Sequence, residues 1–122
     1  MKLYAIDVDH TLQLSDGPVL LSDVSKLHDE KNVVGICGNW ALFVHRVPVW
    51  LDFINFLGPM EMTKAAFLRQ LKTYISANEY IMVGNDHRDL ARWPNGVSRD
   101  AVAAEEAGFR FISEDAFAGG ER

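Results

Sequence analysis

The sequence predicts an α/β domain with three layers, in which helices cover both faces of a parallel, Rossmann-like sheet. Short apolar runs alternate with longer amphipathic segments along almost the whole chain, and this alternation is typical of a parallel sheet. The runs are apolar at consecutive positions, as expected for strands that are buried on both faces. The length of 122 residues suits one domain, so we expect residues 1–122 to form a single core.

The first part of the chain supplies two strands and the helix between them. Residues 3–6 form an apolar run, and a buried strand is predicted over residues 3–8. Over residues 20–31, leucine and valine recur at helical spacing with charged residues between them, which predicts an amphipathic helix. Residues 33–37 predict the second strand. Gly38 breaks this strand, and Asn39 is placed to cap the element that follows.

The stretch from Asn39 to Met62 is the hardest part of the chain to interpret. A short helix after Trp40 is expected to stop at Pro48, because proline interrupts a helix. We expect a short strand at residues 54–57. Thr63 is then predicted to cap a helix. The apolar residues of that helix recur on one face; they are Phe67, Leu68, Leu71, Tyr74 and Ile75.

The last third of the chain repeats the strand and helix pattern. A strand is expected where Tyr80 begins an apolar run, and Gly84 ends it. The later elements are a loop at 87–97, a helix capped by Ser98 and closed by Gly108, a strand at 109–112 and a mobile tail at 113–122. A left-handed glycine such as Gly108 commonly ends a helix.

Composition limits the classes of partner and compartment. The single cysteine, Cys37, cannot form an intramolecular disulfide, so a cytoplasmic location is expected. The apolar runs are too short to span a membrane, and we expect no signal peptide before the first strand. The net charge of −5 disfavours a broad nucleic-acid footprint, although a local basic patch stays compatible with it.

Polar residues follow three of the predicted strands. Asp7 and Asp9 come at the end of the first strand, and side chains two residues apart in a strand point the same way. Two carboxylates that close repel by roughly 4 kcal/mol at an effective dielectric near 20. A divalent hard cation is the usual partner of such a pair, and Mg²⁺ prefers one or two carboxylates together with water and phosphate oxygens. Gly38-Asn39 and Asn85-Asp86 end two other strands, and ligands of parallel sheets bind at this edge.

The order of these features resembles the haloacid dehalogenase-like superfamily of phosphatases, over nearly the whole chain. The features are Asp7-x-Asp9-x-Thr11, Gly38-Asn39, Lys64 at a helix start, and Gly84-Asn85-Asp86. The resemblance implies a small member without a sizeable cap domain and therefore with an open site. Such a site suits a small phosphorylated molecule or a phosphate on a macromolecule, or it is completed by a second subunit of a homo-oligomer.

The resemblance also implies a role for each residue. Asp7 is the expected nucleophile, which becomes an aspartyl phosphate, and Asp9 is the expected general acid and base. The expected substrate-binding residues are Thr11, Gly38, Asn39 and Lys64. The expected Mg²⁺ ligands are Asp7, Asp9, Asn85 and Asp86.

Some assignments stay open at this stage. Gly38 stands where the family usually has Ser or Thr, and the N–H groups of Gly38 and Asn39 can take over the phosphate. Either Asn85 or Asp86 can bind Mg²⁺. The second acidic residue is either Asp89 or Asp100.

The sequence therefore predicts a Mg²⁺-dependent phosphomonoesterase. A nucleic-acid 3′-end phosphatase is an alternative, because Arg88, Arg92 and Trp93 in the loop at 87–97 can hold a phosphate backbone and stack on a base. A catalytically silent binding protein with the same fold is the second alternative, suggested by Gly38 and Asn85.

Overall fold

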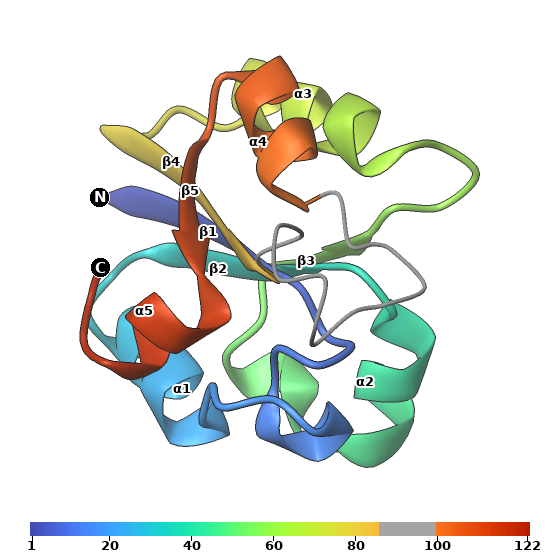
Figure 1. The fold of residues 1–122 in the computed structure, drawn as a ribbon, viewed down its shortest axis with the longest axis vertical. Coiled ribbons are helices and arrows are strands. Elements are labelled where there is room, and N and C mark those ends of the chain that lie inside the picture. The colour runs from blue at the N-terminus through green and yellow to red at the C-terminus, as the bar shows by residue number, and fades with distance from the viewer. Residues whose placement is uncertain (86–99) are drawn as a thin grey trace.

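A computed structural model of the chain describes residues 1–85 and 100–122. Its centre is a five-stranded sheet in the order β3-β2-β1-β4-β5, and every neighbouring pair is parallel. The strands are β1 Lys2–Ile6, β2 Val33–Cys37, β3 Phe56–Gly58, β4 Glu79–Gly84 and β5 Arg110–Ser113. Figure 1 shows the sheet between two layers of helix. The predicted fold class is confirmed.

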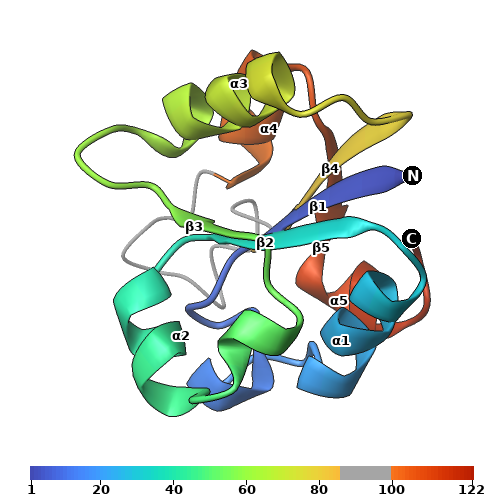
Figure 2. The ribbon, with the colours of Figure 1, turned by 180° about the vertical axis from the view of Figure 1, so that it is seen from behind.

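The helices divide between the two faces of the sheet. They are α1 Leu21–Asp29, α2 Trp40–Arg46, α3 Lys64–Tyr74, α4 Asp100–Ala107 and α5 Glu114–Ala118, with short 3₁₀ turns η1 Gln13–Ser15 and η2 Trp50–Asp52. Helices α3 and α4 cover one face, and α1, α2 and α5 lie on the other, as both views show (Figures 1 and 2). Each face therefore has its own apolar core.

Side chains of β1 alternate between these two cores. Leu3 and Ala5 pack with the side chains of α3 and α4, whereas Tyr4 and Ile6 pack with those of α1 and α5. All four are almost completely buried. This explains why the strand is apolar at each position from Leu3 to Ile6, since a central parallel strand has no face toward water.

Local capping sets where several helices begin and end. The Thr63 hydroxyl accepts a hydrogen bond from the Ala66 N–H at 3.1 Å, so α3 begins as predicted. The Asn39 side chain accepts from the Leu42 N–H at 3.3 Å and caps α2. Gly108 has φ 75° after α4, which is the left-handed conformation expected of it.

The C-terminal segment differs from the mobile tail that the sequence suggested at 113–122. Residues 114–118 form α5, capped by the Ser113 hydroxyl, which accepts from the Ala116 N–H at 3.2 Å. The Phe117 side chain is 0% exposed. Its ring meets Tyr4 edge-on, with centroids 6.3 Å apart, and the Arg122 guanidinium lies 3.9 Å from its centroid. One helical turn is too short to show a periodic pattern, which is why the sequence missed it.

Smaller differences concern element ends. Strand β1 ends at Ile6, before the expected end at residue 8, and β3 is Phe56–Gly58 rather than residues 54–57. Tyr74 was expected on the apolar face of α3, but it is 83% exposed because it is the last residue of the helix. None of the helices in the described part of the chain is both long and apolar enough to cross a membrane.

Several predictions fall on residues 86–99 and lie outside the described residues. They concern Asp86, Asp89, the loop at 87–97 with Arg88, Arg92 and Trp93, and the cap at Ser98.

Candidate functional site

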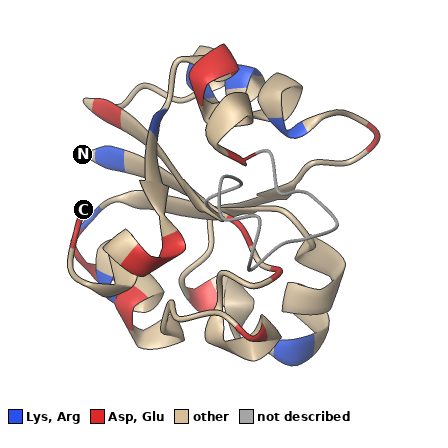
Figure 3. Ribbon diagram, viewed as in Figure 1, with Lys and Arg blue, Asp and Glu red and all other residues tan. Residues whose placement is uncertain are grey.

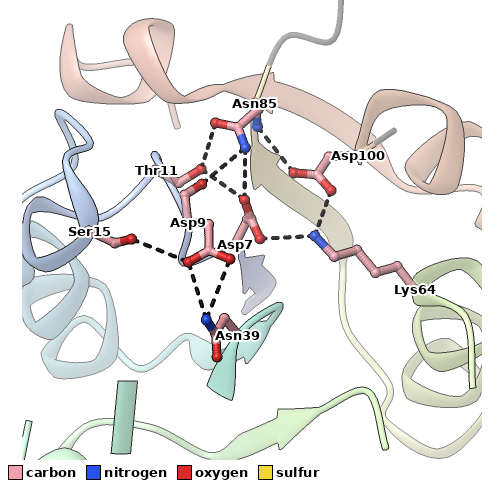
Figure 4. A network of polar contacts seen from close by, with 8 residues as sticks. All are labelled: Asp7, Asp9, Thr11, Ser15, Asn39, Lys64, Asn85 and Asp100. Atoms are coloured by element: carbon pink, nitrogen blue, oxygen red, sulfur yellow. Dashed lines mark hydrogen bonds and ion pairs between the residues drawn. The ribbon is translucent and has the colours of Figure 1, made fainter. Parts of the chain in front are cut away.

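The predicted site residues meet at the carboxyl end of β1 and β4. These strands are neighbours in the sheet. From β1 the chain adds β2 and β3 on one side, and it then returns to add β4 and β5 on the other side. Such a reversal of strand order opens a crevice in parallel sheets. Asp7 follows β1, Asn85 follows β4, Lys64 begins α3 and Asp100 begins α4. Figure 4 shows these side chains pointing toward one another.

Asp7 is the most heavily contacted carboxylate of the site, and it is only 3% exposed. Its Oδ1 accepts a hydrogen bond from Lys64 Nζ at 2.9 Å. Its Oδ2 accepts from the Thr11 hydroxyl at 3.1 Å and from Asn85 Nδ2 at 3.1 Å. Both oxygens are therefore oriented by side chains from other parts of the fold.

Lys64 joins two buried carboxylates. Its Nζ donates to Asp7 Oδ1 and, at 2.7 Å, to Asp100 Oδ1. The other oxygen of Asp100 accepts the Asn85 N–H at 3.1 Å. Burial by itself would lower the pKa of Lys64, but the two carboxylates outweigh it and raise that pKa. Lys64 is thus held charged between them, and Asp100, one of the two candidates for the second acid, lies in the site.

When Asp7, Asp100 and Lys64 are all ionised, these three side chains together carry an excess of negative charge. Burial, and after it the charge of Asp100, raises the pKa of Asp7 to about 7, although Lys64 acts in the opposite direction. Removing a carboxylate from water disfavours its charged form, and a like charge nearby adds to this. A further positive charge beside Asp7 would therefore stabilise its ionised carboxylate.

Asp9 is held separately from Asp7. Its carboxylate is exposed and accepts from the Ser15 hydroxyl at 3.2 Å and from Asn39 Nδ2 at 3.3 Å. Its main-chain oxygen instead accepts from Asn85 Nδ2 at 3.0 Å. Sequence reasoning put both carboxylates at one spot, on the assumption that the strand continues. Because β1 ends at Ile6, the chain turns, and Asp9 offers its carbonyl oxygen to that spot rather than its carboxylate.

The loop after Asp9 explains how Thr11 and Ser15 reach the site. The Thr11 N–H donates to the Val8 carbonyl at 3.1 Å, and the His10 N–H donates to the Ser15 carbonyl at 2.8 Å. Gly17 lies directly against the Thr11 backbone, where a Cβ would collide with it. Ser15 was missed by sequence reasoning, because only this folding back of the loop brings it to Asp9.

Gly38 has a different place from the one expected. Its N–H was predicted to hold a phosphate oxygen, but it already donates to the Gly58 carbonyl at 2.8 Å. In this structure the Gly38 N–H is therefore already engaged by the main chain. A Cβ at Gly38 would collide with Asp7 Oδ1. Because Gly38 has no side chain, the Asp7 carboxylate has room beside the end of β2.

The oxygens around Asn85 suit a small hard cation. Mg²⁺ takes oxygens at about 2.1 Å in an octahedron, whose neighbouring corners are then about 3.0 Å apart. Asp7 Oδ2 and the Asp9 carbonyl oxygen lie 3.1 Å and 3.0 Å from one amide atom of Asn85. If that atom is the amide oxygen, its distance from each of the other two oxygens matches the spacing of adjoining corners. Within residues 1–85 and 100–122, no three His, Cys, Asp or Glu side chains gather to hold a metal ion, so the fit depends on this mixed set.

The Lys and Arg residues of the described ranges are not gathered on one element. Figure 3 shows them scattered over several elements. Comparison with known proteins adds no function: no family model, no curated protein and no solved structure matches the chain.

Proposed function

We propose that the chain is a Mg²⁺-dependent phosphomonoesterase that works through an aspartyl phosphate on Asp7. The observation that carries the proposal is the state of the Asp7 carboxylate. It is buried at the carboxyl edge of the sheet, with Lys64 on one oxygen and Thr11 and Asn85 on the other. A carboxylate oriented in this way beside a fixed cation is suited to attack phosphorus.

In the first step, an oxygen of Asp7 forms a bond to phosphorus while the bond from phosphorus to the leaving oxygen breaks. The electron pair of the broken bond stays on the leaving oxygen, which takes a proton from the Asp9 carboxyl group. Lys64 offsets the charge on the phosphoryl oxygens, since catalysis of this transfer is mostly positioning and charge stabilisation. Ser15 and Asn39 hold Asp9 in place for the transfer.

In the second step, water attacks the phosphorus of the aspartyl phosphate and gives a proton to the Asp9 carboxylate. The bond between phosphorus and the Asp7 oxygen breaks, which releases inorganic phosphate and restores both side chains. The same group therefore acts as acid in one half of the cycle and as base in the other.

Asp7 Oδ2, the Asp9 carbonyl oxygen and the Asn85 amide oxygen are the described atoms that would hold Mg²⁺. When bound, the ion supplies positive charge that reduces the repulsion between a carboxylate and a phosphate. Asp86 is a further candidate from the sequence.

A catalytically silent phosphate-binding protein is the second candidate function. The amide of Asn85 favours it, because this group donates hydrogen bonds to Asp7 Oδ2 and to the Asp9 carbonyl oxygen without a metal. Gly38 favours it as well, because it brings no hydroxyl group to the site. The alternative of a nucleic-acid 3′-end phosphatase rests on Arg88, Arg92 and Trp93, which lie outside the described residues.

The test is a phosphatase screen with small phosphomonoesters and 3′-phosphorylated oligonucleotides, with and without Mg²⁺. We expect Mg²⁺-dependent release of phosphate, lost by several orders of magnitude in Asp7→Asn. Arg69→Met, an exposed change on the same helix as Lys64, is the control and should keep activity. Phosphate binding without turnover by the wild-type protein would favour the silent alternative, and near-normal turnover by folded Asp7→Asn would refute the nucleophile.

A further inference from the structure

The amide nitrogen of Asn85 stands where a third ligand would be expected, beside two oxygens that are suited to a cation. Its nitrogen donates to Asp7 Oδ2 at 3.1 Å and to the Asp9 carbonyl oxygen at 3.0 Å. The residue is 4% exposed. Both N–H bonds of this amide therefore point at oxygens that a metal ion would need.

An amide nitrogen cannot serve as a ligand in this orientation. Its two hydrogens carry positive charge and repel a cation, whereas the amide oxygen carries the lone pairs that bind one. A metal ion can join Asp7 Oδ2 and the Asp9 carbonyl only if the two hydrogen bonds from Asn85 are broken. The amide nitrogen and the cation thus compete for the same two oxygens.

Thr11 is placed to satisfy either orientation of the amide. Its hydroxyl lies 3.1 Å from Asp7 Oδ2 and 3.3 Å from Asn85 Oδ1, and the residue is completely buried. A hydroxyl has one proton and two lone pairs, so here one proton serves two acceptors. If the amide makes a half-turn, its NH₂ group faces the Thr11 oxygen and donates to it. The hydroxyl proton then belongs to Asp7 alone.

The half-turn requires little space. The oxygen and the NH₂ group of an amide are close to the same size, which is why their positions are commonly assigned from the hydrogen bonds around them. Toward Asn85, Thr11 changes from donor to acceptor, so the turned NH₂ group still has a hydrogen-bond partner. Leaving this group unsatisfied would be costly at a site this deeply buried.

We propose that Asn85 closes the cation site in the metal-free protein and becomes a metal ligand by a half-turn of its amide, with Thr11 accepting the displaced NH₂ group. This inference rests on the magnesium site of the proposed function. It gives the metal-free protein a fully bonded site. It also makes metal binding weaker than it would be with a carboxylate at position 85, because two hydrogen bonds must be broken first.

Calorimetric titration with Mg²⁺, and with Mn²⁺ as a second probe, tests the ligand role without any substrate. We expect Asn85→Asp to bind Mg²⁺ at least about tenfold more tightly than the wild-type protein, since ligand charge sets affinity at oxygen sites. Asn85→Ala should bind at least about tenfold more weakly, because it removes a ligand. Binding by Asn85→Ala that equals or exceeds that of the wild type would show a mere obstruction and overturn the inference.

Thr11 provides a matched pair of variants. Thr11→Ser keeps the hydroxyl and should retain metal affinity, whereas Thr11→Val keeps the shape, cannot accept the NH₂ group, and should bind Mg²⁺ about tenfold more weakly. Equal affinities for the two variants would remove Thr11 from the exchange and overturn that part of the inference.

A direct readout follows the side-chain NH₂ group of Asn85 by NMR in ¹⁵N-labelled protein, assigned by its absence from the Asn85→Ala spectrum. Both of its proton signals should shift on saturation with Mg²⁺. Signals that stay unchanged at saturation would overturn the half-turn, even if Asn85→Asp does not fold. Absence of metal binding in all variants would refute the metal site as well. If Mg²⁺ binding and the Asn85 signals behave as expected but the protein has no phosphatase activity, only the proposed function is refuted.

Discussion

The buried carboxylate of Asp7 sets how stability depends on pH. The unfolded chain titrates this group near its ordinary value of 3.8, whereas burial and Asp100 raise its pKa in the folded protein to about 7. The folded state therefore binds the proton more tightly, and Asp7 contributes stability at low pH that is lost as the pH rises through about 7. A neutral side chain of the same shape would not lower the stability of the folded protein as the pH rises.

Asp7→Asn is expected to be more stable than the wild type at pH 8 in the presence of EDTA, and the difference should shrink at pH 5. The variant removes the buried charge that Asp100 repels, while Lys64 keeps its bond to Asp100. Thermal unfolding of both proteins at the two pH values measures this. A difference in Tm that is the same at pH 5 and pH 8 would contradict the raised pKa of Asp7.

Asp9 differs from Asp7 in being exposed, and this suits a group that exchanges protons with a leaving group and with water. Under the proposed function, Asp9→Asn should slow the cleavage of alkyl or sugar phosphates by about 100-fold or more, the usual range for an acid catalyst. The loss for p-nitrophenyl phosphate should be smaller, because its leaving group is stable without a proton. Single-turnover rates for the two substrate types decide this, and equal losses would take the acid role from Asp9.

At the scale of secondary-structure elements, the ends of β1 and β2 approach so closely that only glycine fits at position 38. Gly38→Ala should destabilise the protein by about 1–3 kcal/mol, the usual cost of an overpacked site, because the new Cβ would collide with Asp7 Oδ1. Urea unfolding measures the effect. Gly119→Ala is the control, since its Cβ would meet nothing nearer than the Asp115 carbonyl oxygen at 3.3 Å. Equal stability of the two variants would show that the strand ends adapt freely.

Helix α5 is a second test at this scale, because its main contact with the core is a single ring. Phe117→Ala should cost about 3–5 kcal/mol, as truncation of a buried aromatic side chain does, because Phe117 is fully buried against Tyr4. Phe117→Leu fills most of the space and should cost less. A Phe117→Ala protein with unchanged urea midpoint would mean that α5 does not pack on the sheet in solution.

For the whole molecule, Cys37 is a built-in reporter of opening. It lies in the core between the sheet and α3 with 0% exposure, and burial raises the pKa of its thiol to about 12. The thiolate is the reactive form, so the native protein should resist iodoacetamide at pH 8. Labelling followed by mass spectrometry should be slower than in the urea-unfolded chain by about 1,000-fold or more, since a stability of about 5–15 kcal/mol keeps the open fraction small. Comparable rates in both states would contradict the buried position of Cys37.

The sequence by itself determined the layered α/β architecture and several element boundaries. Apolar runs and helical spacing are local patterns, and the caps at Thr63 and Asn39 act within one turn of helix. A local pattern can be interpreted without knowing where the rest of the chain lies. The rule that parallel strands present their carboxyl ends at one edge then brought Asp7, Asn39 and Asn85 to the same region, and the family resemblance added Lys64.

Only the tertiary structure decided which atoms of the candidate site meet. It placed Asp100 against Lys64, turned the carbonyl rather than the carboxylate of Asp9 toward Asn85, and engaged the N–H of Gly38 within the sheet. It also brought Ser15 to the site through a folded loop. The reason is physical: each of these contacts joins residues separated by turns or by whole elements. The direction of a side chain after a strand end depends on how the chain bends there, which no periodic pattern in the sequence records.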